Sequence, residues 1–298
     1  MAAIREFQPK ELFFAVDGPR NSEEEHIVQQ VRNVVMEIDW DCEIHKRFSS
    51  VNKGCKQGVF DAIDWFFEEV PQGVILEDDC IPSLSFLNFC EEMLDYFKED
   101  QRIYSICGTN HGLRSEHDSY YFSTFFQAWG WATWRRAWRG FDVNLKSWES
   151  FRKQFEVRDF MCSEMEAERQ TNNFNLVSKG DLDTWDYSWN FHVLMNHGLN
   201  VISNNNGVIN IGHDDEATHT NVTDGSELYN QYDTFPEEVI HPKFIVPNRS
   251  LERMYGSLKF GFPLDGVKRA EPINDKPSIF ERSILKLKTL LRQIFGLI

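Results

Sequence analysis

The sequence predicts an α/β fold in which a mostly parallel sheet is flanked by helices. Short apolar runs of strand length alternate with segments whose apolar residues recur at helical spacing. The chain has 298 residues, enough for one large domain or two of roughly 150 residues each, and it is 41% hydrophobic and 26% charged. Because alternating strands and helices form sheets that are covered on both faces, we expect a buried, mainly parallel sheet.

The first strand is predicted at 12–16, where an apolar run ends at Asp17 and Gly18. Apolar residues at helical spacing then predict a helix over 27–38. The same alternation continues with strands at 42–44, 73–76 and 103–107, a helix over 59–67, and a helix over 86–97 that Ser85 caps.

Beyond residue 110 the pattern is less regular. It comprises an aromatic segment at 120–138, a charged helical stretch to about 170, a Trp-rich segment at 183–189 and short strands at 201–202 and 208–211. We divide the chain into a main domain at 1–222, an irregular extension at 223–276 and an amphipathic basic helix at 277–298.

The charge balance of the chain disfavours one class of binding partner. Lys and Arg number 31 against 47 Asp and Glu, so the net charge is −16, which disfavours nucleic-acid binding. The six cysteines are dispersed without zinc-ligand spacing, and we expect them to be reduced. Residues 1–10 show no apolar leader pattern, so we expect a cytoplasmic protein.

Three consecutive acids, Glu77, Asp78 and Asp79, follow the strand predicted at 73–76. Like charges in contact are costly unless a cation neutralises them, and hard oxygen ligands suit Mg²⁺ or Mn²⁺. Such a cation commonly bridges to phosphate oxygens, so the segment predicts a diphosphate ligand at the carboxyl end of the sheet. The alternative is a solvated acidic turn.

Trp129, Trp131 and Trp134 have a mixed spacing that one amphipathic helix would not produce. A loop that faces a sugar explains it, because aromatic rings pack on the apolar faces of sugars and Gly130 allows close approach. We expect Trp131 to take part in donor binding. Packing of these rings in the core is the alternative.

The segment 74–83 resembles the acidic, DXD-like metal motif of GT-A glycosyltransferases, which use nucleotide-diphosphate sugars. Further motifs occur in the order found in bacterial glycosyltransferase-like proteins of surface-polysaccharide gene clusters, and more distantly in the eukaryotic N-acetylglucosaminyltransferase I that starts hybrid N-glycans. They are 52–56 (NKGCK), 108–110 (GTN), 129–134 (WGWATW), 183–186 (DTWD) and 217–220 (ATHT). The similarity covers about 8–222 and implies the Rossmann-like GT-A fold.

The resemblance implies roles for individual residues. Asp79 is the expected metal ligand, and Glu77 and Asp78 face the donor ribose and the metal shell. Asp186 matches the catalytic base of inverting relatives, which removes the proton of the acceptor hydroxyl. Asp183 is the competing candidate for that base.

The remaining candidates follow from the same resemblance. Asp17 matches a contact to the donor base, and His219 matches a histidine near the metal or the diphosphate, for which His213 and Asp215 are alternatives. Lys56 is a candidate diphosphate contact or a solvated side chain. Relatives carry a further strand and helix before the strand at 12–16, so we expect a shortened N-terminus.

The predicted function is therefore a metal-dependent, inverting hexosyl- or N-acetylhexosaminyltransferase that uses a nucleotide-diphosphate donor, with UDP by resemblance, and a polysaccharide or lipid-linked glycan acceptor. The alternatives are a sugar-nucleotide hydrolase or nucleotidyltransferase, and a degenerate glycan-binding protein without activity. The helix at 277–298 is expected at the inner face of the cell membrane, on the protein's own surface or in a dimer contact.

Overall fold

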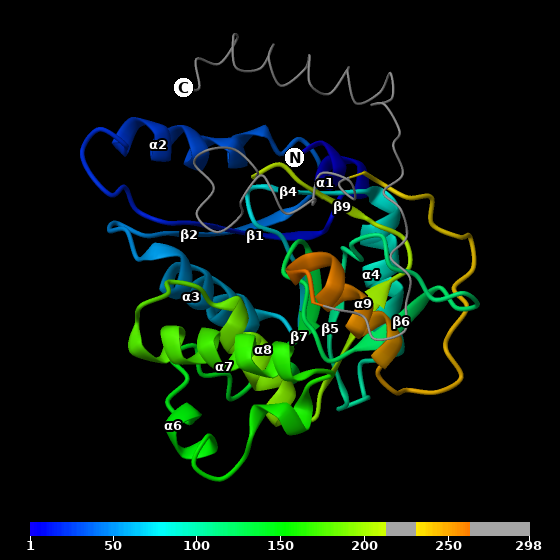
Figure 1. The fold of residues 1–298 in the computed structure, drawn as a ribbon. Helices are drawn as coiled ribbons and strands as arrows, with labels where there is room; N and C mark the ends of the chain where they lie inside the picture. Colours follow the sequence, from blue (N-terminus) through cyan, green and yellow to red (C-terminus); the bar gives the residue numbers. More distant parts are fainter. Residues whose placement is uncertain (213–230, 263–298) are drawn as a thin grey trace. The chain divides into compact units, whose positions relative to one another are not determined.

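The computed structural model describes residues 1–212 and 231–262 (Figure 1). The chain divides into two compact units, Met1–Pro263 and Leu264–Ile298, of which the second lies outside the described residues. The basic helix expected at 277–298 and the candidate ligand His219 also lie outside them.

The first unit is a mixed α/β structure built on three sheets. Five strands form the largest sheet in the order β3-β7-β5-β8-β6, whereas β1 pairs with β2 and β4 pairs with β9. The strands are β1 Glu11–Val16, β2 Glu43–Phe48, β3 Gln72–Ile75, β4 Cys80–Pro82, β5 Ile103–Cys107, β6 Tyr120–Ser123, β7 Trp131–Trp134, β8 Leu199–Ser203 and β9 Val208–Asn210.

The pairing within these sheets is more mixed than the sequence suggested. Strands β1 and β2 are parallel, as are β5 and β8. Strand β7 lies antiparallel between β3 and β5, and β6 lies antiparallel to β8. Strands β4 and β9 are also antiparallel. Strands β6 and β7 come from the aromatic segment at 120–138, where continuous apolar sequence gave no alternating pattern.

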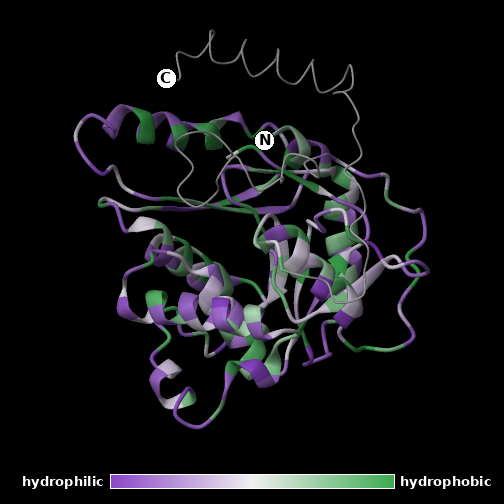
Figure 2. Cartoon of the chain, in the orientation of Figure 1, coloured by the Kyte–Doolittle hydropathy of each residue, from purple (hydrophilic) through white to green (hydrophobic). Residues whose placement is uncertain are grey.

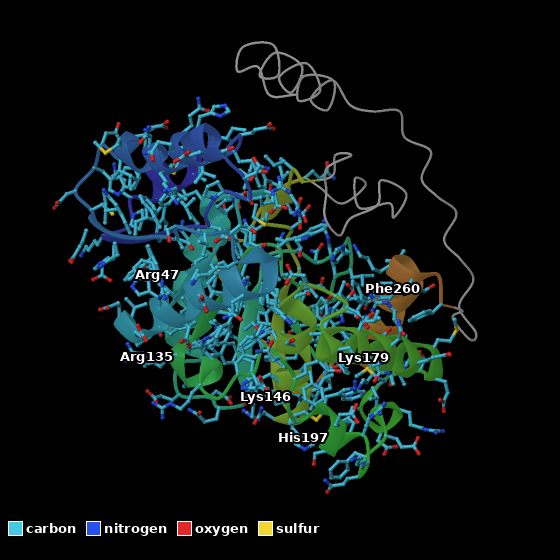
Figure 3. The ribbon with its side chains drawn as sticks, turned by 90° about the vertical axis from the view of Figure 1, so that its left-hand side faces the viewer. Arg47, Arg135, Lys146, Lys179, His197 and Phe260 are labelled. Atoms are coloured by element: carbon cyan, nitrogen blue, oxygen red, sulfur yellow. The ribbon has the colours of Figure 1, made fainter. Side chains whose placement is uncertain are left out.

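Helix α4 packs on one face of the five-stranded sheet, and helices α3, α5 and α8 pack on the other. The helices of the described residues are α1 Ala2–Phe7, α2 Glu25–Asn33, α3 Gly54–Glu69, α4 Leu84–Tyr96, α5 Arg135–Trp138, α6 Trp148–Phe151, α7 Glu164–Lys179, α8 Asp186–Met195 and α9 Arg249–Phe260, with short 3₁₀ turns at Val34–Glu37 and Val157–Phe160. Figure 3 labels Lys179 and Phe260, the last residues of α7 and α9.

Successive side chains of β7 point to opposite faces of the five-stranded sheet. Ala132 and Trp134 pack with the apolar face of α4 in one core cluster. Trp131 packs on the other side with residues of α3, α5 and α8. Helix α2 has no buried residue and shows alternating polar and apolar bands in Figure 2, as expected for a surface helix.

The structure changes two details of the sequence-based prediction. Helix α4 is capped by Ser83 rather than Ser85, because the Ser83 hydroxyl accepts the Phe86 N–H at 3.1 Å. Helix α9 lies within the 223–276 segment that was expected to be irregular. None of the helices in the described ranges is both long and apolar enough to cross a bilayer.

The cap on α4 can be tested with a matched pair of serine variants. We expect Ser83→Ala to lower stability by about 1 kcal/mol, because one orphan N–H of the helix loses its acceptor. Thermal unfolding would show a midpoint about 2–4 °C lower. Ser85→Ala, at an exposed position of the same helix, should leave the midpoint unchanged. An equal loss in both variants would contradict the cap.

Candidate functional site

The acidic segment lies directly after β3 and is linked to the Trp-rich segment. Burial raises the pKa of the half-buried Glu77 to about 8, with further contributions from the charges of Asp79, Asp186 and Asp78. The indole of Trp185 donates a hydrogen bond to the Glu77 carboxylate. Segments about a hundred residues apart in the sequence therefore share one site.

Asp186 is the first residue of α8 and one of the residues that line a cavity. Its carboxylate accepts a hydrogen bond from the Thr184 hydroxyl. Burial raises the pKa of the Cys55 thiol to about 12, and the charges of Glu77 and Asp186 add to that increase. The carboxylates of both segments thus lie close to the start of α3.

Asp183 has a different position from Asp186. Its carboxylate accepts the N–H groups of Cys55 at 3.1 Å and Lys56 at 3.4 Å, in the first turn of α3. Gly54 precedes them with φ +77°, and a Cβ there would lie 2.7 Å from Asp183 Oδ2. Asp183 therefore holds the N-terminus of α3, and Asp186 is the carboxylate that faces the cavity.

Asp79 lies against the end of β9. Its Oδ2 accepts a hydrogen bond from Asn210 Nδ2 at 3.1 Å, and its backbone carbonyl accepts the Ile211 N–H at 2.9 Å. A Cβ at Gly212 would lie 2.5 Å from Asp79 Oδ2, so only glycine fits there without a shift. The described stretch of the chain therefore ends at Gly212, beside Asp79.

The other two predicted donor contacts lie near the start of α3. Asp17 accepts the N–H of Gly18 and the N–H of Lys53, each at 2.8 Å, so it holds the loop that precedes the helix. Lys56 lies in the first turn of α3, next to Asp183. The structure thus places the backbone N–H of Lys56 beside Asp183 and gives Asp17 a local contact in the loop.

Trp131 lies in the core rather than on a surface that faces a sugar. It has no exposed area, and its ring stacks on Trp185 with 5.5 Å between centroids. The residue that approaches Gly130 is Val208, whose Cγ2 would lie 2.6 Å from an added Cβ. Trp131 and Trp134 lie on opposite faces of β7, and their spacing is mixed because this strand is buried on both faces.

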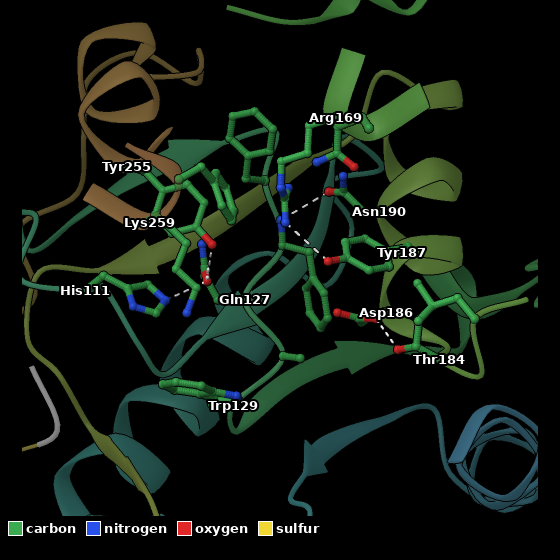
Figure 4. Close-up of a pocket in the computed structure, with 16 residues that line it drawn as sticks. His111, Gln127, Trp129, Arg169, Thr184, Asp186, Tyr187, Asn190, Tyr255 and Lys259 are labelled. Carbon is green, nitrogen blue, oxygen red and sulfur yellow. Dashed lines mark hydrogen bonds between the residues drawn. The ribbon is translucent and has the colours of Figure 1, made fainter. Parts of the chain in front are cut away.

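A cavity of about 360 Å³ lies beside Asp186 (Figure 4). Trp129 lines this cavity, together with residues of α7 and α9 that belong to no recognisable sequence motif. Gln127 accepts from Tyr255 Oη at 3.4 Å and is hydrogen-bonded to the ring of His111 at 2.9 Å. The lining residues that the sequence analysis did not single out are His111, Phe125, Phe126, Gln127, Ala128, Arg169, Gln170, Leu182, Thr184, Tyr187, Asn190, Tyr255, Lys259 and Phe260.

The acidic segment offers oxygen ligands of the kind that a divalent cation prefers. Carboxylate oxygens are hard ligands, and the charges of Asp79 and Asp78 add to the increase in the pKa of Glu77 that burial causes. Among the described residues, the one group of three with ligand atoms within 4.8 Å of one another is instead Glu11, Glu43 and His45, on the surface. Mg²⁺ commonly takes only one or two carboxylates, so a site at Asp79 would not need a group of three.

No protein-family model matches the chain, and no curated protein matches it significantly.

The different positions of Asp183 and Asp186 predict opposite effects on stability. Asp183→Ala should destabilise the protein by about 1–2 kcal/mol, because the first turn of α3 loses its anionic acceptor. Asp186→Asn should leave the unfolding midpoint unchanged or raise it, since one charge that repels Glu77 is removed. Thermal unfolding of both variants at neutral pH measures this. A larger loss in Asp186→Asn would contradict the assignment of Asp183 to the helix.

Proposed function

We propose that this protein is a metal-dependent glycosyltransferase of the GT-A type that moves a hexosyl or N-acetylhexosaminyl group from a nucleotide-diphosphate donor, a UDP-sugar, to a glycan acceptor with inversion. One observation carries the proposal. Asp186 lines an aromatic cavity, and its charge acts on Glu77 together with those of Asp78 and Asp79 at the end of β3. The motif order in the sequence supports the same reaction.

In this proposal the carboxylates have separate tasks. Asp79, with Glu77 or Asp78, holds Mn²⁺ or Mg²⁺, which when bound neutralises the diphosphate that departs. Asp186 accepts the proton of the acceptor hydroxyl as its oxygen bonds to the anomeric carbon and the bond from that carbon to the diphosphate breaks. The Thr184 hydroxyl, hydrogen-bonded to Asp186, holds this carboxylate in place.

The two sides of the site suit two substrates. The acidic segment and the start of α3 would receive the donor, and the cavity beyond Asp186 would receive the acceptor. Aromatic walls such as those of Trp129 and Tyr187 offer apolar surface for a sugar ring. A polysaccharide or a lipid-linked glycan presents such a terminal sugar. The protein would then work in the cytoplasm, at the inner face of the membrane for a lipid-linked acceptor.

Two variants separate donor binding from transfer. With Mn²⁺ and UDP, the wild-type protein should unfold at a higher temperature, because a ligand that binds only the folded state stabilises it. Asp79→Ala should lose that shift. Asp186→Asn should keep the shift and lose at least about 100-fold in transfer rate, as expected when a general base is removed.

Asp95→Ala is the matched control, since Asp95 is an exposed carboxylate whose ion-pair partner is Lys98. It should keep both the shift and transfer. Donor hydrolysis without transfer to any glycan would contradict the proposal in favour of a hydrolase. A metal-dependent shift that persists in Asp79→Ala would contradict the metal site.

A further inference from the structure

The cavity beside Asp186 carries two cationic side chains, although the protein has a net charge of −16. Arg169 extends from α7 and Lys259 from α9, and both line the cavity (Figure 4). Among the lining residues these two cations outnumber the one carboxylate, Asp186, and this balance favours a local positive potential. Such a potential favours an anionic ligand.

Arg169 is positioned by apolar and aromatic contacts more than by acids. Its guanidinium carbon lies 3.4 Å from the centre of the Phe260 ring, and Nη2 donates to Tyr187 Oη at 3.2 Å. Glu166 Oε1 lies 4.0 Å from Nη1, an ion-pair distance that is too long for a hydrogen bond. That oxygen accepts from Gln170 Nε2 instead.

These contacts fix the guanidinium, and its ion pair with Glu166 is too long for a hydrogen bond. A planar guanidinium presents five N–H donors and binds carboxylate or phosphate groups through two parallel hydrogen bonds. Stacking on Phe260 reduces the rotamer freedom that binding would otherwise remove. Arg169 is therefore suited to hold an oxyanion.

Lys259 adds a second cation from the same helix as Phe260. Its ammonium lies 5.2 Å from the centre of the Trp129 ring, within the range of a cation–π contact. Asp186 contributes the opposite charge to the cavity wall. A ligand with an anionic group and a hydroxyl could therefore bind in one orientation, with the anion at the cations and the hydroxyl at the carboxylate.

We propose that the cavity binds a saccharide that carries an anionic group, either the carboxylate of a uronic acid or a phosphate ester, through Arg169 and Lys259. Its role as the acceptor rests on the function proposed above. Binding of the anionic saccharide itself does not, because it requires only the cavity.

The experiment measures the dissociation constants of glucuronic acid, glucose 6-phosphate and glucose by ligand-observed NMR, together with that of UDP in the presence of Mn²⁺. At least one anionic sugar should bind about tenfold more tightly than glucose, and less so at high salt. Preference for glucuronic acid identifies a carboxylate ligand, and preference for glucose 6-phosphate identifies a phosphate ligand.

The variants test the two cations. Arg169→Gln and Lys259→Gln should each weaken binding of the anionic sugar about tenfold and leave the glucose and UDP constants unchanged. Arg169→Lys keeps the charge and should lose less than Arg169→Gln. Lys179→Gln on α7 and Arg253→Gln on α9 are the matched controls, because each removes an exposed cation from the same helix without touching the cavity.

Equal binding of glucose and both anionic sugars, or loss of binding in the control variants alone, would overturn the inference. If no saccharide binds but UDP with Mn²⁺ does, the inference fails and the proposed transferase stands. If an anionic sugar binds in an Arg169-dependent way and UDP does not bind, the inference stands and the proposed transferase fails.

Discussion

The contact between Asp183 and the N-terminus of α3 is the constraint on which the site depends. Two backbone N–H groups, those of Cys55 and Lys56, point at one carboxylate that comes from almost 130 residues later in the chain. The partial positive charge of a helix N-terminus makes that carboxylate favourable there. Since Trp185 and Asp186 follow immediately, the same contact places both beside the acids after β3.

A buried carboxylate fixes the opposite wall. The side chain of Glu252 in α9 is fully buried and accepts hydrogen bonds from the N–H and hydroxyl of Thr124, just after β6. Arg249, one turn earlier in α9, pairs with it at 2.8 Å. Because a buried charge is tolerated only when it is paired and hydrogen-bonded, α9 is held to the sheet at one place. Tyr255, Lys259 and Phe260 thereby reach the cavity.

The sequence predicted much of the framework and less of the site. The local pattern of apolar residues predicted β5 at Ile103–Cys107 with the bounds that the structure has. The same kind of pattern did not predict β7. A strand buried on both faces shows no alternation, so its period cannot be seen. Asp183 and Asp186 also could not be distinguished by spacing, because the difference between them is a contact with α3. The cavity residues of α7 and α9 belong to no motif, and only the folded chain brings them together.

The residues that line the cavity come from distant parts of the sequence, and this determines when during folding the cavity can bind a ligand. Its lining runs from His111 to Phe260 and combines three helices, α7, α8 and α9, with the segment between β6 and β7. Contacts between residues so far apart in sequence form late, because chain closure must precede them. During synthesis, a nascent chain without α9 would lack one wall of the cavity. Ligand binding at this place therefore reports assembly of the chain between His111 and Phe260 rather than of any local segment.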